Sequence, residues 1–187
     1  MQIQVITSND LMELLKTFSP AIVGVVGMVF TYRISKKALD SSIKDGERKD
    51  IHEKLNKFYG PFQQLLNKNN KLYELFNPEG KFRTLTELLN GRKFKGNSGK
   101  LLKEIVEIDR QLEKLILDHG GLIDDEEMLE ILVEAATHFN LLIKAYEKTI
   151  EGETGKFKKY VYPRKLGEKI DEQIKKMKKR LEVLNKA

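Results

Sequence analysis

The sequence predicts an all-α protein in which an N-terminal transmembrane helix precedes a cytoplasmic bundle of about five helices. Three observations lead to this prediction. The 187-residue chain is rich in Leu, Lys, Glu and Ile and has only 4 Pro and no Trp, a composition that favours helices. Apolar residues recur at spacings of three and four over most of the chain. One segment near the N-terminus carries no charge.

The uncharged segment is 17–32 (TFSPAIVGVVGMVFTY), bracketed by Lys16 and Arg33. Sixteen helical residues are about 24 Å long, and flanking Lys and Arg side chains together with local thinning let such a helix cross a hydrocarbon core of ~30 Å. The alternatives are a buried core helix, which usually has a polar face, and a signal peptide, which needs a basic leading region. We predict a transmembrane helix over 17–33.

Flanking charge predicts the orientation of this helix. One basic residue, Lys16, precedes it, whereas six follow closely: Arg33, Lys36, Lys37, Lys44, Arg48 and Lys49. By the positive-inside rule, 1–16 form a short extracytoplasmic N-terminus, 34–50 a basic juxtamembrane stalk and 51–187 the cytoplasmic bundle. The chain is thus predicted to be a single-pass protein of the cell membrane.

Within the bundle, an apolar stripe predicts a first helix over 51–76, which Gly60-Pro61 should kink or split. Turn residues at 77–80 end it, and a short helix follows near 85–90. After a Gly- and Lys-rich loop at 91–99, Asn97 or Ser98 is expected to cap a helix over 100–118.

The next helix is predicted over 125–150 and has two adjoining apolar seams, as expected for a helix with neighbours on several sides. The acidic run 124–127 at its start suits the positive end of a helix, and we interpret it as capping rather than as a metal site. His138 lies in one seam, where it is either a hydrogen-bonded core histidine or a protonatable switch.

The last predicted helix has an apolar seam from Ile170 to Leu184, and its other faces are basic. From 156 to 187 there are 12 basic and 4 acidic residues, a net charge of +8 within a chain of net +6. This face is either solvated surface, a site for anionic lipid or an acidic partner, or a nucleic-acid contact, for which no binding motif is present. The candidate residues are Lys175, Lys176, Lys178, Lys179 and Arg180.

Small residues in the predicted span indicate self-association. Ala21, Gly24 and Gly27 recur every three residues and would form a shallow groove along one side of a helix. In lipid, helices associate through close packing at small residues, because no hydrophobic driving force brings them together. We therefore predict a homo-oligomer that contacts through this groove.

The sequence offers no credible catalytic residues and predicts no cofactor or metal. There is no Cys, which excludes thiol nucleophiles, cysteine-ligated zinc and iron–sulfur clusters, and no Gly-rich phosphate-binding loop. One pattern, Arg48 followed by His52, resembles the Arg/His pair of all-helical HEPN nucleases, which have four to six residues between the two; here three intervene. A HEPN-like ribonuclease is thus a minor alternative.

The layout as a whole resembles a group of small prokaryotic single-span proteins. The resemblance lies mainly in residues 10–70: a short outer N-terminus, a Gly-containing span, a basic stalk and the segment 57–66 (KFYGPFQQLL). Some proteins of this plan are membrane effectors of antiviral systems that accompany CRISPR nucleases or prokaryotic Argonautes. The resemblance implies a protein that alters membrane integrity or potential when a cytoplasmic event changes its assembly.

Two functions of different classes follow from these observations. The first is a non-enzymatic, self-associating membrane effector, which would contact membrane lipids and further copies of itself. The alternative is a membrane-anchored adaptor, whose bundle recruits a cytoplasmic protein or a nucleoprotein complex.

Overall fold

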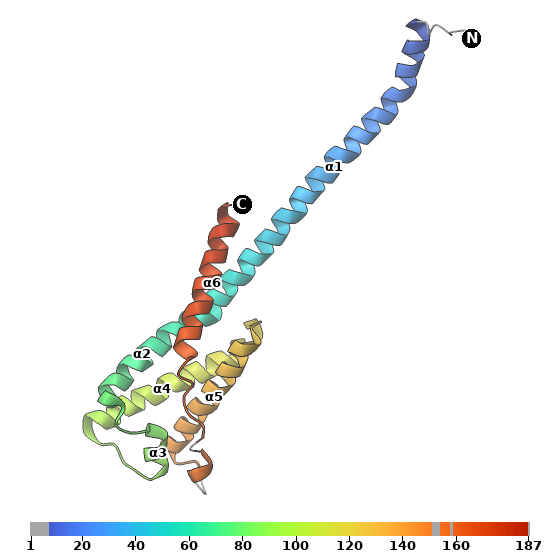
Figure 1. Cartoon of the computed structure of the whole chain (residues 1–187). Helices are drawn as coiled ribbons and strands as arrows, with labels where there is room; N and C mark the ends of the chain where they lie inside the picture. Colours follow the sequence, from blue (N-terminus) through green and yellow to red (C-terminus); the bar gives the residue numbers. More distant parts are fainter. Residues whose placement is uncertain (1–7, 151–153, 158, 187) are drawn as a thin grey trace. The chain divides into compact units, whose positions relative to one another are not determined.

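The computed structural model describes residues 8–150, 154–157 and 159–186, and their side chains from residue 28 onward apart from residues 29 and 154. All regular secondary structure in these residues is helical, which confirms the predicted all-α class (Figure 1). The chain divides into two compact units, 1–48 and 49–187. Five α-helices, α2 to α6, lie wholly in the second unit.

The first helix, α1, runs without interruption over Ser8–Lys54. Large apolar side chains are exposed to solvent in the described part of α1 before residue 49. They are those of Met28, Phe30, Tyr32, Ile34, Leu39 and Ile43. No helix is long and apolar enough to cross a membrane within the part of the chain that the structure describes. The transmembrane helix predicted at 17–33 therefore has no support there, and most of its side chains, including those of Ala21, Gly24 and Gly27, lie outside the described residues.

The predicted interruption at Gly60-Pro61 is confirmed, in the form of a π-helical turn. The turn Leu55–Tyr59 separates α1 from α2, which covers Gly60–Phe76. Pro61 has no N–H, and its ring would clash with the carbonyl one turn earlier, so the wider turn lets the chain continue helically. Gly60 donates to the carbonyl of Leu55, and a Cβ at this position would lie only 2.8 Å from that oxygen.

The π-turn and α2 contribute one buried face. Phe58 and Tyr59 of the turn and Phe62, Leu66 and Phe76 of α2 are buried, while Leu65 is only partly covered. Helix α2 then ends at Phe76, and a 3₁₀ turn over Pro78–Gly80 follows, as the turn residues predicted.

The next two helices are α3, Thr84–Leu89, and α4, Gly96–His119. Helix α4 begins four residues before the predicted start at Lys100, and neither Asn97 nor Ser98 caps it; the residue before the helix is Lys95. Gly99 packs against the carbonyl of Phe94, where a Cβ would come within 2.7 Å of the oxygen, and this close approach allows the earlier start.

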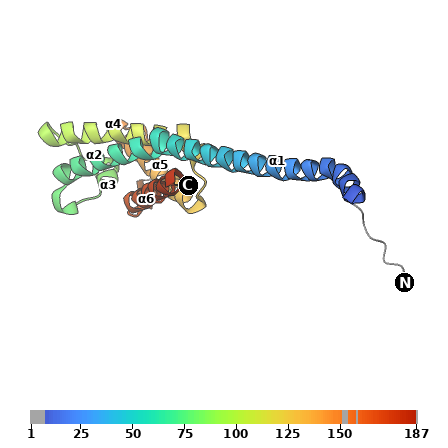
Figure 2. The same cartoon turned by 90° about the horizontal axis from the view of Figure 1, so that it is seen from above.

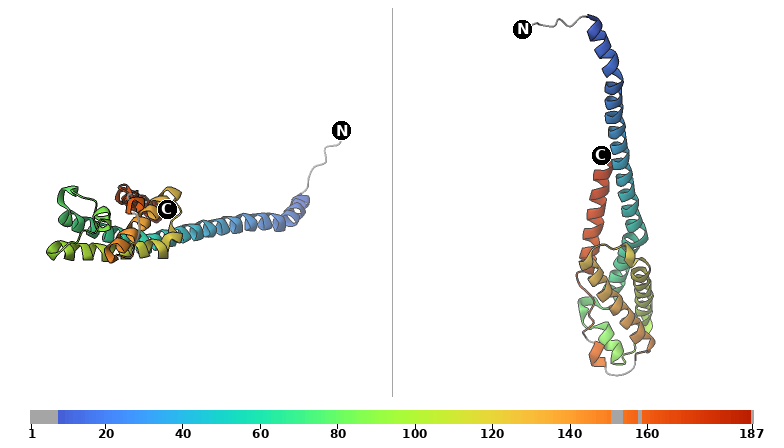
Figure 3. Two further views of the ribbon diagram at one scale, coloured as in Figure 1. Left: turned by 90° about the horizontal axis from the view of Figure 1, so that it is seen from below. Right: turned by 90° about the vertical axis from the view of Figure 1, so that its right-hand side faces the viewer.

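Helix α5, Glu126–Glu147, contacts α3, α4 and α6, consistent with its wide apolar arc. Helix α6, Leu166–Lys186, packs on α2, on α5 and on the π-turn, on the side of them away from α4 (Figure 2; Figure 3, left). Its buried residues follow the predicted seam, with Ile170, Ile174, Met177 and Leu184 in the core.

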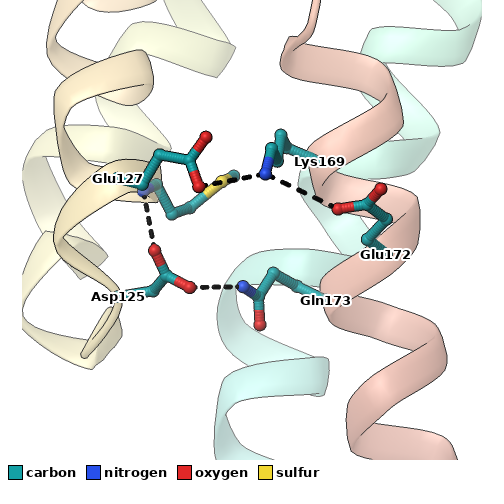
Figure 4. A network of polar contacts seen from close by, with 6 residues as sticks. Asp125, Glu127, Lys169, Glu172 and Gln173 are labelled. Atoms are coloured by element: carbon teal, nitrogen blue, oxygen red, sulfur yellow. Dashed lines mark hydrogen bonds and ion pairs between the residues drawn. The ribbon is translucent and has the colours of Figure 1, made fainter.

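Polar contacts fasten the start of α5 to α6 (Figure 4). Asp125 caps α5 by accepting from the N–H of Met128 at 3.0 Å, and its second oxygen accepts from Gln173 at 2.8 Å. The ammonium of Lys169 lies 3.0 Å from Glu127 and 3.7 Å from Glu172. The acidic run 124–127 thus caps α5 and forms ion pairs, including that of Asp124 with Lys54.

The core of the second unit has two buried clusters. The first joins the π-turn, α2, α4, α5 and α6, and its members include Phe58, Phe62, Leu66, Leu112, Leu132, Phe139 and Ile170. The second joins α2, α3, α4 and α5, through Phe76, Leu85, Leu102, Ile105, Val106, Leu142 and Ile143. Along α2 and α4, two buried polar residues, Asn69 and Asp109, lie between members of these clusters.

Candidate ligand pocket

A cavity of about 790 Å³ opens within the second unit, where the C-terminal half of α2, the start of α3, the middle of α4 and α5 and two loops meet. Its lining includes Asn69 and Tyr73 from α2, residues 77–80 and 82–86, Asp109 from α4, His138 and Phe139 from α5, and the loop residues 160–162. Ligand pockets of this size usually combine apolar walls with a few convergent polar groups, and this cavity has that composition.

The deepest polar pair is Asp109 with Asn69. Asp109 is 2% exposed, and Oδ1 of its carboxyl group accepts a hydrogen bond of 2.7 Å from Nδ2 of Asn69. The amide oxygen of Asn69 is buried and has no hydrogen-bond partner among the described residues. A buried acceptor without a donor costs free energy, so a ligand that donates a hydrogen bond to the amide oxygen of Asn69 would remove that cost.

Burial raises the pKa of Asp109 from its ordinary value of 3.8 to about 8. The hydrogen bond from Asn69 opposes this rise, and the nearby charge of Glu113 adds to it. A desolvated carboxyl group holds its proton, so Asp109 is largely neutral at pH 7 unless a positive charge approaches it. Strongly shifted carboxyl groups in cavities are frequent in functional sites.

The wall next to this pair is made by the end of α2 and the start of α3. The hydroxyl of Tyr73 donates to that of Thr84 at 2.5 Å, and burial raises the pKa of Tyr73 to about 12. Asn77 donates from Nδ2 to the carbonyl of Phe82 at 2.8 Å. Its amide oxygen, like that of Asn69, is buried without a partner in the described part of the chain.

His138 and Tyr162 form the opposite wall. Nδ1 of His138 lies 3.1 Å from the carbonyl oxygen of Tyr160, and burial lowers the pKa of the imidazole. A neutral ring that donates Nδ1–H to a carbonyl keeps Nε2 as an acceptor. The rings of His138 and Phe139 pack on that of Tyr162, with centroids 5.8 and 6.2 Å apart.

His138 is the one residue singled out from the sequence that lines this pocket. The hydrogen bond to Tyr160 fits the core-histidine interpretation, and its role as a switch stays a prediction. Lys175, Lys176, Lys178, Lys179 and Arg180 lie on the exposed face of α6. Of the HEPN-like pair, Arg48 lies 2.7 Å from Asp45, and His52 is exposed.

Sequence reasoning missed Asn69, Asp109 and Asn77. The first two left a signal: Asp109 follows Ile105 by four residues and precedes Leu112 by three, so it occupies a position on the apolar seam of its helix. Asn69 follows Leu66 by three in the same way. A polar residue in a buried seam needs a partner, and each of these two supplies one for the other.

No cluster of three or more His, Asp or Glu suited to a metal ion occurs in the residues that the structure describes. Comparison of the chain with protein-family models, with curated proteins and with solved structures finds no match. The pocket is therefore interpreted from its own chemistry. Acceptor oxygens, aromatic faces and a carboxyl group of raised pKa suit the binding of a ligand that donates hydrogen bonds.

Proposed function

We propose that this chain is a non-enzymatic, single-span membrane protein that self-associates and acts as an effector on membrane integrity or potential. The observation that carries the proposal is the uncharged segment 17–32, which lies inside one unbroken helix of 47 residues and precedes a basic stalk. In this proposal the helix anchors the chain with its N-terminus outside, and 49–187 lie in the cytoplasm. Prokaryotic antiviral defence is the setting that the architectural resemblance suggests.

Exposed apolar residues beyond the uncharged segment support self-association. Leu39 and Ile43 are four residues apart on α1, so they lie on one side of the helix, and they are 61% and 60% exposed. Large apolar side chains in solvent at helical spacing are typical of surfaces that meet another helix. A second copy of α1 would cover them in an oligomer.

The pocket supports regulation of such an effector from the cytoplasm. A ligand that binds one state of the domain better than another shifts the equilibrium between the two states. The buried amide oxygens of Asn69 and Asn77 would accept from a donor ligand in the state described here. The domain 49–187 would thus sense a small molecule, and the N-terminal helix would act on the membrane.

The test is expression of the full chain in bacterial cells that contain a voltage-sensitive dye. We expect loss of membrane potential together with cross-linked oligomers. The double substitution Gly24→Ile and Gly27→Ile fills the predicted groove and should reduce both signals, whereas Val25→Ile with Val26→Ile is a matched control and should reduce neither. An unchanged potential on expression of the wild-type chain would reject the effector function.

The exposed basic face of α6 favours a second candidate, a membrane-anchored adaptor. Four lysines, Lys175, Lys176, Lys178 and Lys179, lie on this face while Met177 between them is buried. Substitution of the four by Gln should abolish co-purification of an acidic partner and leave folding intact. A matched variant with the exposed Lys93, Lys95, Lys100 and Lys103 changed to Gln should retain the partner. If both variants retain it, α6 is not the recruiting surface.

A further inference from the structure

A buried carboxyl group and two buried amide oxygens line the pocket, and the two amide oxygens have no donor in the described part of the chain. The carboxyl group of Asp109 receives one hydrogen bond from Asn69. The amide oxygens of Asn69 and Asn77 have no donor within the described part of the chain, although both residues are more than nine-tenths buried. All three residues line the cavity. Such a set selects a ligand rich in N–H groups and disfavours one that brings further acceptors.

The charge of the lining points to a cation. Three acidic residues, Glu74, Glu79 and Asp109, line the cavity, against one basic residue, Arg83. Glu74 and Glu79 also pair with Lys71 at 3.4 Å and Lys81 at 3.1 Å, so Asp109 is the lining carboxyl group that a ligand cation would meet without a protein cation beside it. The aromatic rings of Tyr73, Phe82, Phe139 and Tyr162 belong to the same lining. Aromatic faces attract organic cations through their negative π-surface, and the attraction is strongest where water is excluded.

The spacing of the acceptors indicates an elongated ligand. Asn69 and Asn77 are eight residues apart along α2 and its C-cap, which corresponds to about 12 Å along a helix axis. Residues this far apart along the chain favour a ligand with two donor groups over one with a single ammonium group. An ammonium near Asp109 and Asn69 and a second one near Asn77 would satisfy both ends, with an alkyl chain along the aromatic wall between them.

We propose that this pocket binds a linear aliphatic diamine or polyamine, with one ammonium group held by Asp109 and Asn69 and another held by Asn77. This inference does not depend on the membrane-effector function, since binding is measured on the purified chain. The proton of Asp109 leaves when the ligand binds, because an adjacent ammonium group stabilises the carboxylate. Below the pKa of Asp109, which is about 8, each bound diamine therefore releases up to one proton.

The direct test is calorimetric titration of the full chain in a neutral detergent, with three probes of equal length. 1,8-Diaminooctane should bind with one-to-one stoichiometry. 8-Amino-1-octanol, which has one ammonium group, should bind at least tenfold more weakly, and octanedioate should not bind. Absence of diamine binding at millimolar concentration, equal affinity for the monoamine, or preference for octanedioate would overturn the proposal.

Two variants and a pH series locate the site. Asp109→Asn should weaken diamine binding at least tenfold, while Asp118→Asn, an exposed position on the same helix, should leave it unchanged. The wild-type affinity itself should increase by up to about tenfold per pH unit from pH 6 to 7.5, because the bound carboxylate forms more readily as pH approaches the pKa of Asp109. A pH-independent affinity, or equal binding by wild type and Asp109→Asn, would contradict the assigned role of Asp109.

Discussion

The two units of this chain differ in how far their apolar side chains are buried. In 49–187 most large apolar side chains of the helices pack in a core, where Phe58, Phe62 and Ile170 have no exposed surface, although some, such as Leu117, are exposed. In 1–48 the described apolar side chains of α1 are exposed, from Met28 at 75% to Ile43 at 60%. The second unit therefore has a buried apolar core, whereas the described apolar side chains of the first have none to pack into. In the function proposed above, 49–187 fold and bind a ligand, and 1–48 attach the chain to the membrane and assemble it.

The largest effect should separate a core residue from an exposed one. Phe62→Ala removes a fully buried ring from the first cluster and should lower the free energy of unfolding by about 3–5 kcal/mol. Leu39→Ala in α1 should change it by less than about 0.5 kcal/mol, because that side chain is 61% exposed. Urea titration followed by circular dichroism measures both. Similar losses in the two variants would show that α1 is packed as tightly as the bundle.

The next largest effect should be a dependence of folding stability on pH that is caused by Asp109. Because its pKa is raised from 3.8 to about 8, the folded state keeps a proton that the unfolded state releases, so stability falls as pH rises between these values. From pH 6 to pH 8 the loss should be about 2 kcal/mol. Asp109→Asn should remove this slope, and Asp118→Asn should keep it. Parallel stability curves for wild type and Asp109→Asn would disprove the raised pKa.

A smaller effect is expected at the junction of α5 and α6. Asp125→Ala removes the N-cap of α5 and the acceptor for Gln173, and it should cost about 1 kcal/mol of stability. Glu130→Ala, at an exposed position of the same helix, is the control and should be nearly neutral. Equal midpoints of urea unfolding for the two variants would mean that the cap and its contact to α6 contribute nothing measurable.

The smallest effect should come from His138. Burial lowers its pKa below 6.5, so the folded state resists protonation, and stability is lost as pH falls through the unfolded value of about 6.5. Glu134 is the acidic residue one turn before His138 on α5. The carbonyl oxygen of Tyr160 lies 3.1 Å from Nδ1 of His138. His138→Asn should flatten the stability curve between pH 5 and 7 by less than about 1 kcal/mol. If the stability of the variant depended more steeply on pH, the pKa of His138 would not be lowered in the folded state.

Features set by neighbouring residues could be predicted from the sequence. Gly60-Pro61 predicted an interrupted helix, and the acidic run predicted the cap that Asp125 forms, because both depend on backbone groups a few residues away. The seam of α6 was predicted because its apolar residues follow the helical period. The start of α4 was not, because it depends on the close approach of Gly99 to the carbonyl of Phe94 rather than on a side-chain cap.

The pocket could not be predicted in the same way. Asn69, Asp109 and His138 come from three helices, and only the packing of α4 against α2 and α5 brings them to one cavity. Each residue alone is an ordinary polar side chain in a helix. The unpaired oxygens of Asn69 and Asn77 are properties of the folded chain, since they depend on which donors the neighbouring segments supply. The seam positions of Asp109 and Asn69 were the local signals of buried polar groups.

The most direct test asks whether 1–48 attach the protein to the membrane. It uses the fact that the chain contains no Cys, so that a single introduced Cys can be labelled specifically. Single-cysteine variants Ser8→Cys and Asn185→Cys are expressed in bacteria, and intact cells are treated with a membrane-impermeant maleimide. If 1–48 attach the protein to the membrane with the N-terminus outside, Ser8→Cys is labelled in intact cells, Asn185→Cys is labelled only after lysis, and both variants stay in the membrane pellet after a carbonate wash. Release of the protein by carbonate, or labelling of Asn185→Cys from outside, would contradict it.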